Sequence, residues 1–244
     1  NSTTNNVASA LTAGTYEVTI TDANGCFDSA SVTISEPSTL LSIAITNSSD
    51  VLCNSLATGE ATALATGGGL PYTYSWSNGF ADTTNSGLTA GTYGVSVLDN
   101  YGCEMSTSVT ITEPNALALS VASSSNVDCF GADNGAATIQ VNGGTPGYNY
   151  LWSNNVTTNS IANVGPGTYS LTVTDANNCM DTTSVVITEP TDLTASITNS
   201  QNVACNGSAT GFAVVAGAGG TLPYTYAWDN GATGDSIFNQ TSGF

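Results

Sequence analysis

The chain has 244 residues, 18 acidic side chains and no Lys, Arg or His, which gives it a formal net charge of −18. Nucleic acids and anionic membrane surfaces are excluded as partners, because proteins bind both through cationic side chains. The absence of His and Lys also removes the usual general bases and nucleophile activators, so the sequence does not predict an enzyme. Repulsion between the acidic side chains favours an extended, soluble array.

One phrase recurs three times along the chain. The segments AGTYEVTITDANGC, AGTYGVSVLDNYGC and PGTYSLTVTDANNC begin at residues 13, 90 and 166. The Trp residues recur at nearly the same period, since Trp76, Trp152 and Trp228 are 76 residues apart. A fixed period of domain size predicts a tandem array of small domains rather than a solenoid. We place complete repeats at 38–114 and 115–190, the C-terminal part of a repeat at 1–37 and the N-terminal part of a repeat at 191–244.

The strands expected in a complete repeat follow one another along 38–114. Strands are predicted at 40–47 (LLSIAITN), 59–66 (GEATALAT) and 71–76 (PYTYSW), where alternation places Tyr72, Tyr74 and Trp76 on one face. An Asn78-Gly79 turn comes next and is a hairpin signal. Two further strands, GTYGVSVLD and STSVTIT, are joined by the turn NYGC. No segment has a helical period, so about seven strands in an all-β, Ig-like β-sandwich are predicted for each repeat.

Two features sharpen the expectation of an Ig-like fold. The phrase LTAGTY at 11–16 and 88–93, with VGPGTY at 164–169, has the form of a tyrosine corner. In that motif a Tyr near the start of the sixth strand bonds to backbone a few residues upstream. The Trp on the third strand of each repeat is expected in the core. The alternative for this Trp is an exposed platform that stacks on sugars.

Several short motifs recur in a fixed order, namely CNG, PYTYSWSNG, LTAGTY, DANGC and VTISEP. In this order, and at a period of 76 residues, they resemble the SprB-type repeats of bacterial gliding adhesins, and the resemblance covers essentially the whole chain. It implies a large surface protein of Bacteroidota that is exported by the type IX secretion system. It therefore implies an extracellular or cell-surface location, and it supplies neither a ligand nor catalytic residues.

Six cysteines occupy two fixed places in the repeat. One place lies between the first two strands and the other in the turn between the last two strands, which gives Cys53, Cys129 and Cys205 for the first, and Cys26, Cys103 and Cys179 for the second. No CxxC or Cys-His pattern typical of metal binding occurs, so disulfides formed in an oxidising compartment are predicted.

The expected topology limits how these cysteines pair. The two turns lie at opposite ends of an Ig-like sandwich, about 30 Å apart for a nine-residue strand, whereas bridged Cα atoms lie within about 7 Å. Pairing the first-turn Cys of one repeat with the last-turn Cys of the next is therefore favoured. Within this chain that pair is Cys53 with Cys179, and the other cysteines would pair beyond its ends. Pairs inside one repeat, such as Cys53 with Cys103, and free thiols are the alternatives.

Acidic residues recur with the repeat as well. An Asp ends the sixth strand and a Glu precedes the Pro of each linker, which gives Asp22, Asp99 and Asp175, and Glu36, Glu113 and Glu189. In a chain without cations these acids are candidate calcium ligands at domain junctions, where oxygen atoms of two domains meet. The favoured alternative is that each Asp forms an Asx turn and each Glu-Pro pair is an extended linker. No other cofactor is expected.

A modification motif is suggested by four Asp-Ser or Asp-Thr pairs that precede a small or aliphatic residue or another Thr. They resemble the O-glycosylation motif of Bacteroidota. The candidate acceptors are Ser29, Thr83, Thr182 and Ser236.

Together these features predict a structural segment of a secreted adhesin or filament. The segment is expected to be a rod of Ig-like repeats that projects from the cell surface or transmits force there, without inserting into a membrane. Its expected partners are neighbouring repeats or subunits of a filament, with surface glycans as a further candidate. The alternative function is a carbohydrate-binding array, which needs exposed aromatic side chains. The loop aromatics are Phe80, Tyr101 and Phe130, and they occupy different places in different repeats.

Overall fold

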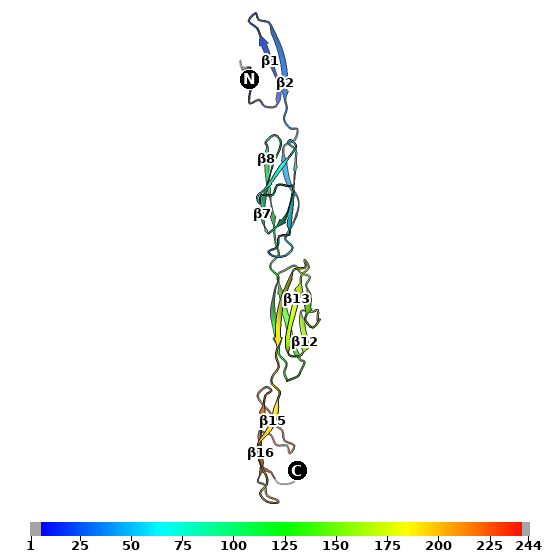
Figure 1. Cartoon of the computed structure of the whole chain (residues 1–244), viewed down its shortest axis with the longest axis vertical. Coiled ribbons are helices and arrows are strands. Elements are labelled where there is room, and N and C mark those ends of the chain that lie inside the picture. Colours follow the sequence, from blue (N-terminus) through cyan, green and yellow to red (C-terminus); the bar gives the residue numbers. More distant parts are fainter. Residues whose placement is uncertain (1–5, 241–244) are drawn as a thin grey trace. The chain divides into compact units, whose positions relative to one another are not determined.

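The structure, a computed structural model, describes residues 6–240 (Figure 1). Within this range every regular element is a β-strand, and the strands pair into small antiparallel sheets, which confirms the all-β class. The same residues contain no helix that could cross a membrane. The chain separates into two compact units, Asn1–Glu113 and Pro114–Phe244. Each unit contains one complete repeat and one part of a repeat.

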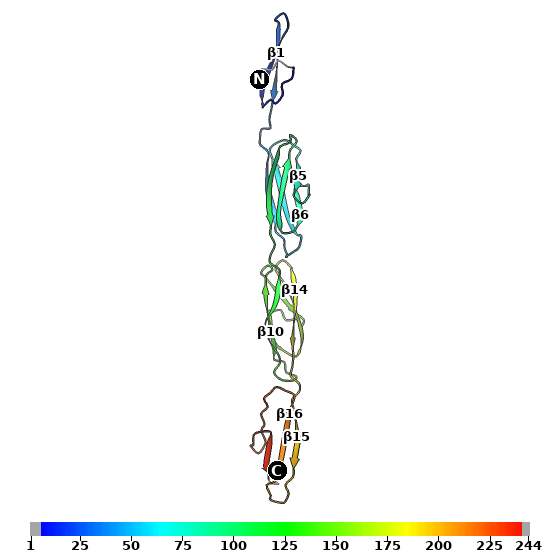
Figure 2. The ribbon, with the colours of Figure 1, turned by 90° about the vertical axis from the view of Figure 1, so that its left-hand side faces the viewer.

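Two three-stranded sheets form the complete repeat of the first unit (Figure 2). Their pairing order matches the A-B-E and C-F-G strands of an Ig constant-type sandwich, without strand D. The Ig-like sandwich is thus confirmed. One sheet holds β3 (Ser42–Ser49), β4 (Gly59–Thr66) and β6 (Thr84–Leu88), and the other holds β5 (Thr73–Trp76), β7 (Gly91–Leu98) and β8 (Glu104–Ile111).

The expectation of about seven strands is wrong, because residues 77–83 form a loop between β5 and β6 instead of a strand. The indole N–H of Trp76 donates to the carbonyl oxygen of Asp82 at 2.8 Å, and the backbone N–H of Trp76 donates to the carbonyl of Phe80 at 2.8 Å. The loop is therefore folded back over the Trp. The Asn78-Gly79 turn lies in this loop but does not make a paired hairpin, since β5 pairs with β7.

The complete repeat of the second unit has the same topology. Its F and G strands pair in the same register as those of the first repeat, with Gly167 opposite Ile187 where the first repeat has Gly91 opposite Ile111. One sheet holds β9 (Ala118–Ser125), β10 (Gly135–Asn142) and β12 (Ser160–Val164), and the other holds β11 (Asn149–Trp152), β13 (Gly167–Thr174) and β14 (Met180–Ile187).

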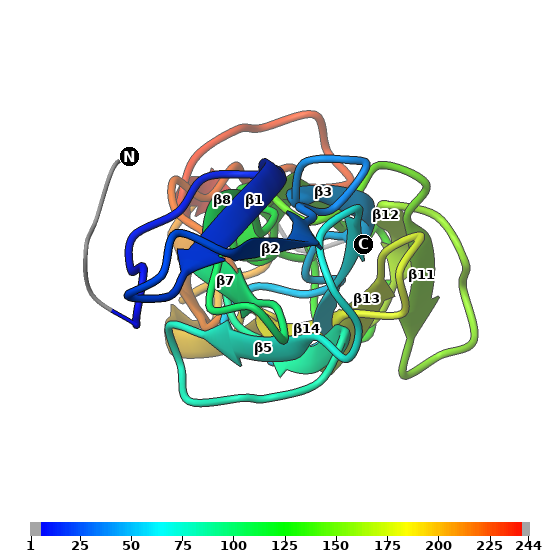
Figure 3. The ribbon, with the colours of Figure 1, turned by 90° about the horizontal axis from the view of Figure 1, so that it is seen from above.

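Each partial repeat contains a single sheet. In the first unit, β1 (Gly14–Thr21) and β2 (Phe27–Ile34) form a hairpin that corresponds to the F and G strands (Figure 3). In the second unit, β15 (Thr194–Gln201), β16 (Gly211–Ala218) and β17 (Ser236–Gln240) form a sheet that corresponds to A, B and E.

A small apolar core lies between the two sheets of each complete repeat. Alternate residues of β4 are buried, and the three alanines among them share one cluster with Trp76, Val95 and Val97. Gly59 begins the same strand, where a Cβ atom would lie 2.7 Å from Cγ2 of Ile111 and 2.9 Å from the carbonyl oxygen of Leu88. The sheets approach so closely at this point that only glycine fits, and Gly135 occupies the equivalent position in the next repeat.

The three predicted tyrosine corners are confirmed. The hydroxyl of Tyr93 donates to the carbonyl oxygen of Thr89 at 3.0 Å, four residues upstream. Tyr16 makes the equivalent bond to Thr12 at 2.8 Å, and Tyr169 makes it to Gly165 at 3.0 Å. Each bond fixes the chain where it enters the F strand, which is the fifth strand of a complete repeat.

The predicted core position of the Trp residues is confirmed only in the complete repeats. Trp76 and Trp152 are fully buried, whereas Trp228 is half-buried. Trp228 still donates its indole N–H to the carbonyl oxygen of Gly234, at 3.0 Å, so its loop is formed. In the part of the chain that the structure describes, the last repeat contains only β15, β16 and β17, and no F and G strands cover the ring.

The close approach at Gly59 predicts that Gly59→Ala destabilises the repeat. Overpacking a core of this kind costs about 1–3 kcal/mol, and the clash with backbone at Leu88 is not relieved by a side-chain rotation. Gly94→Ala is the matched control, because a Cβ there meets nothing nearer than 4.0 Å. Thermal melts of both variants provide the measurement. Equal melting temperatures for the two variants would contradict the assignment.

Candidate functional site: acidic turns and cysteine loops at the repeat ends

A buried carboxylate shapes the turn between the last two strands of the first complete repeat. Asp99 is only 4% exposed. Its Oδ1 accepts hydrogen bonds from the backbone N–H of Tyr101 at 2.8 Å and of Cys103 at 2.9 Å, and its Oδ2 accepts one from Gly69 at 2.9 Å. The bond to the residue two positions on makes this an Asx turn. The bond to Gly69 ties the turn to the loop between β4 and β5.

The second complete repeat repeats this arrangement. Asp175 is 2% exposed, and its Oδ1 accepts from the backbone N–H groups of Asn177 and Cys179, both at 2.9 Å. Its Oδ2 accepts from Thr145 at 2.8 Å. In the β1–β2 hairpin, Asp22 makes the same two bonds within its turn, to the residues two and four positions on. All three predicted Asp positions therefore hold the turn that carries a Cys.

The backbone donors lower the pKa of both buried carboxyls. The N–H of Gly69 is the largest cause of the lowered pKa of Asp99. Burial is the largest influence at Asp175 and raises its pKa, but the N–H groups of Thr145, Cys179 and Asn177 together outweigh it, so the net pKa is lowered. Both side chains are therefore carboxylates near neutral pH, held by backbone dipoles.

Acidic side chains also fix the loop that carries Cys53, at the opposite end of the first complete repeat. The Oε2 of Glu113 accepts from the backbone N–H of Ser55 at 2.6 Å. The Oδ1 of Asp50 accepts from the N–H of Thr112 at 2.7 Å, and this bond lowers the pKa of Asp50. The loop is thus joined to the end of the last strand, and Cys53 lies at the C-terminal end of its repeat.

The loop of Cys129 is held in the same way in the next repeat. Glu189 accepts through Oε2 from the N–H of Gly131 at 2.8 Å, and Asn126 takes the place of Asp50 by accepting from Thr188 at 2.9 Å. The Glu residues before the linker prolines are therefore more than linker residues. Glu36, in the first partial repeat, is exposed.

The candidate calcium ligands do not come together within a repeat. Asp99 lies in the turn at one end of the sandwich, and Glu113 lies at the other end. Each oxygen of Asp99 and Asp175 already accepts at least one backbone hydrogen bond. Among residues 6–240 there is no group of three or more Cys, Asp or Glu side chains placed to hold a metal ion. Calcium binding stays a hypothesis.

The cysteines fall into two states. Cys53 and Cys179 are disulfide-bonded. Because Cys103 is a free thiol, the alternative pair inside one repeat, Cys53 with Cys103, is not formed. The pairing of Cys53 with Cys179 stays a prediction. The free cysteines are all exposed and are Cys26, Cys103, Cys129 and Cys205.

The four candidate glycosylation acceptors share a local geometry. In three of them the preceding Asp carboxylate accepts a hydrogen bond from the acceptor's own backbone N–H, at 2.7–2.9 Å, and in Ser236 it accepts from the hydroxyl at 3.2 Å. Ser29 and Thr182 are exposed, whereas Thr83 and Ser236 are half-buried. Ser29 and Thr182 are therefore the more accessible acceptors, and their modification stays a prediction.

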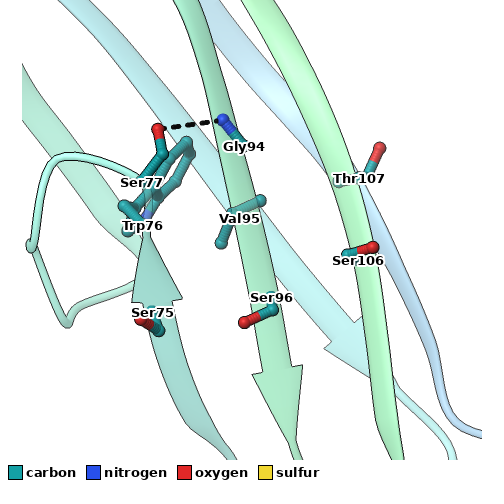
Figure 4. A pocket seen from close by; sticks show the side chains of 8 residues that line it. All are labelled: Ser75, Trp76, Ser77, Gly94, Val95, Ser96, Ser106 and Thr107. Atoms are coloured by element: carbon teal, nitrogen blue, oxygen red, sulfur yellow. Dashed lines mark hydrogen bonds between the residues drawn. The ribbon is translucent and has the colours of Figure 1, made fainter.

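An open hollow of about 350 Å³ lies on the sheet of β5, β7 and β8 (Figure 4). Within it the N–H of Gly94 donates to the hydroxyl of Ser77 at 3.2 Å. The only aromatic residue in the lining is Trp76, which is 2% exposed and cannot stack on a sugar ring. The exposed loop aromatics Phe80, Tyr101 and Phe130 do not line it. The lining residues are Ser75, Trp76, Ser77, Gly94, Val95, Ser96, Ser106 and Thr107.

Sequence reasoning missed the long-range partners of these acids. The bond between Glu113 and Ser55 joins residues 58 positions apart, and the bond between Asp99 and Gly69 spans 30 positions. The recurrence of each acid at the repeat period was the available signal that the acid has a structural role. It could not name the backbone donor on the neighbouring loop.

The buried carboxylates predict that stability is lost in acid. Because the folded-state pKa of Asp99 lies below its unfolded value of about 3.9, its contribution is present above that pH and is lost as the pH falls through the lower folded pKa. Asp99→Asn should lower the melting temperature at pH 7 and weaken its dependence on pH below about 5. The matched control is Glu104→Gln, an exposed acid of the same repeat. If Asp99→Asn melts at the same temperature as the wild type both at pH 7 and below about pH 5, the role assigned to the carboxylate is wrong.

Several solved structures are similar to the chain. The structure of Sidekick-1 immunoglobulin domains 1–5 is 10% identical, with a TM-score of 0.34, and the match covers 91% of this chain and 56% of that one. A tetra-tandem repeat from the extending region of a large adhesion protein is 17% identical, with a TM-score of 0.29 and coverage of 96% and 75%. Drosophila OTK, extracellular domains 3–5, is 13% identical, with a TM-score of 0.25 and coverage of 84% and 90%. At these TM-scores the likenesses carry no argument about function. No curated protein matches the chain.

A family match is found in each of three successive repeats. The SprB repeat matches residues 45–80, 121–157 and 197–233. The matched segments begin 76 residues apart, which is the period of the Trp residues. In the two complete repeats each match runs from the first strand to just beyond the third, and so includes the first-turn Cys and the core Trp. The SprB repeat thus matches the chain three times, which confirms the resemblance to the SprB-type repeat family.

Proposed function

We propose that the chain is a structural, non-catalytic segment of a secreted cell-surface adhesin or filament, in which the repeats form a force-bearing stalk. The observation that carries the proposal is the match of three successive segments to the SprB repeat at one constant period. The residues that recur between the complete repeats build the core, the tyrosine corner and the loops at the repeat ends. The loops at the ends of one repeat therefore have the same structure as those of the next repeat. Ends of this kind are suited to linking similar units in series.

The loops at the repeat ends support a disulfide between successive repeats. Cys53 lies at the C-terminal end of its repeat, where Glu113 holds its loop. Cys179 lies at the N-terminal end of the next repeat, since Asp175 binds its turn to Thr145 and the neighbouring Gly144 donates to the carbonyl of Asn115 at 2.9 Å. In the sequence, the C-terminal end of the first complete repeat directly precedes the N-terminal end of the second. We therefore propose that the disulfide-bonded Cys53 and Cys179 are bonded to each other.

Such a disulfide changes which residues carry a pulling force. A force that enters at the N-terminus would pass along β3 to Cys53, cross to Cys179 and leave along β14. The residues between the two cysteines would carry no load, so most of both sandwiches is protected. An oxidising, extracellular compartment is the setting in which this kind of bond persists.

Single-molecule stretching tests the pairing. The two cysteines are 126 residues apart in the sequence, and a chain of that length extends to roughly 420–450 Å. Adding a reductant should therefore increase the extension of the fully unfolded chain by about that length. The Cys53→Ser variant should show the longer extension without reductant, whereas Cys103→Ser should behave as the wild type. An extension that does not respond to reductant would overturn the pairing.

The location and the candidate modification need native material. Antibodies raised against the chain should label the outer surface of intact cells that produce it, and labelling confined to the cell interior would contradict the proposal of a surface adhesin. Mass measurement of proteolytic peptides from the same material tests glycosylation, with added hexose masses expected on peptides that contain Ser29 or Thr182. If the recurring acids bind calcium, a calcium chelator should lower the melting temperature, and an unchanged melting temperature would contradict the calcium hypothesis.

A further inference from the structure

One amide side chain is buried inside the first complete repeat. Asn85, on β6, is only 1% exposed. The residue 76 positions on, in the second complete repeat, is Ile161, which is 2% exposed. Burying an amide is unfavourable unless its hydrogen bonds are made. Because the same fold accepts an aliphatic residue at this position one repeat later, the sandwich itself does not require the amide of Asn85.

Asn85 is paired with Asn78, in the loop that folds back over Trp76. Nδ2 of Asn85 donates to Oδ1 of Asn78 at 3.0 Å, and Nδ2 of Asn78 donates to Oδ1 of Asn85 at 3.4 Å. Asn78 itself is exposed. The buried amide therefore fixes the carboxamide of a residue at the surface.

The residue that follows Asn78 makes this carboxamide reactive. Gly79 has no side chain to shield its backbone nitrogen, and a Cβ there would meet nothing within 4 Å. In an Asn-Gly pair this nitrogen can attack Cγ of the Asn, so that the N–Cγ bond forms, the Cγ–Nδ2 bond breaks and ammonia leaves with the proton of the N–H. Water then opens the cyclic imide to Asp or to isoaspartate. Asn is one of the thermally labile residues for this reason.

The loops over the other two Trp residues show a matching correspondence. In the last repeat the dipeptide is Asn230-Gly231, and Nδ2 of Asn230 donates to Oε1 of Gln240, on β17, at 3.0 Å. In the second complete repeat the dipeptide is Asn154-Asn155, so the unshielded Gly is missing, and Ile161 has no amide to offer. In these three loops an amide on strand E thus accompanies Asn-Gly and is missing without it.

We propose that Asn78-Gly79 is a deamidation site and that Asn85 keeps it unmodified by fixing the carboxamide of Asn78. The N–H of Gly79 also donates to the carbonyl oxygen of Trp76 at 2.9 Å, so the attacking nitrogen has to leave this bond as well. Deamidation would put a carboxylate opposite Oδ1 of Asn85, and isoaspartate would lengthen the backbone of the loop that covers Trp76. The amide pair thus preserves the core of the repeat. The inference does not depend on the proposed adhesin function.

Incubation of the whole chain at mildly alkaline pH, followed by digestion and peptide mass measurement, tests the proposal. Chymotrypsin cleaves after Trp76 and Phe80 and releases residues 77–80, which contain the site. Asn85→Ile copies the second complete repeat and should deamidate at Asn78 at least about tenfold faster than the wild type, because two hydrogen bonds to the carboxamide are lost. Adding Gly79→Asn to this variant copies Asn155 as well and should abolish the increase.

Melting temperatures of the same samples separate this effect from a general loss of structure. Asn85→Val is a second, smaller apolar variant, which should also accelerate the reaction if Ile does not fit this core. Ser86→Ala, the exposed neighbour on the same strand, is the matched control and should deamidate like the wild type. If a folded Asn85→Ile or Asn85→Val chain deamidates at the wild-type rate, or if Ser86→Ala accelerates the reaction as much, the proposal is wrong.

Discussion

Hydrogen bonds from backbone N–H groups to carboxylates are the interaction on which the ends of each repeat depend. A buried carboxylate is stable only when donors satisfy it, and this chain has no cationic side chain to supply them. Asp99 and Asp175 each accept three backbone bonds instead. Because two of the donors lie in the Asp's own turn and one in a neighbouring loop, a single side chain fixes two loops together. Every buried polar side-chain atom among residues 6–240 has a partner.

The turns and loops that these carboxylates hold are the ones that carry the cysteines. Cys103 and Cys179 each lie four residues after a buried Asp. The backbone N–H of each Cys donates one of the hydrogen bonds that this Asp accepts. Cys53 belongs to a loop held at the other end of the sandwich by Glu113. A cysteine carried by a loop with fixed hydrogen bonds loses little further freedom when it forms a disulfide. The acids and the cysteines are thus parts of one arrangement, repeated in each domain.

The same small core explains the difference between complete and partial repeats. Small residues on β4, with Gly59 at its start, let the two sheets approach closely around one Trp. Within residues 6–240 the last partial repeat contains a single sheet, and its Trp228 is half-buried although its own loop is formed. Local bonds shape each loop, but only the second sheet makes the core.

The sequence by itself determined the period, the all-β class, the tyrosine corners and the residues that recur at the repeat ends. These features are local: alternation along a strand, a turn motif or a spacing of 76 residues is visible without the fold. The strand count was overestimated, because a Trp76 side chain that bonds to Asp82 keeps residues 77–83 as a loop. Only the tertiary structure decided which backbone group each acid binds, because Ser55 and Glu113 are brought together by strands that lie far apart in the chain. It also decided how far each Trp is buried, because burial depends on the sheet that packs opposite and not on the strand that carries the ring.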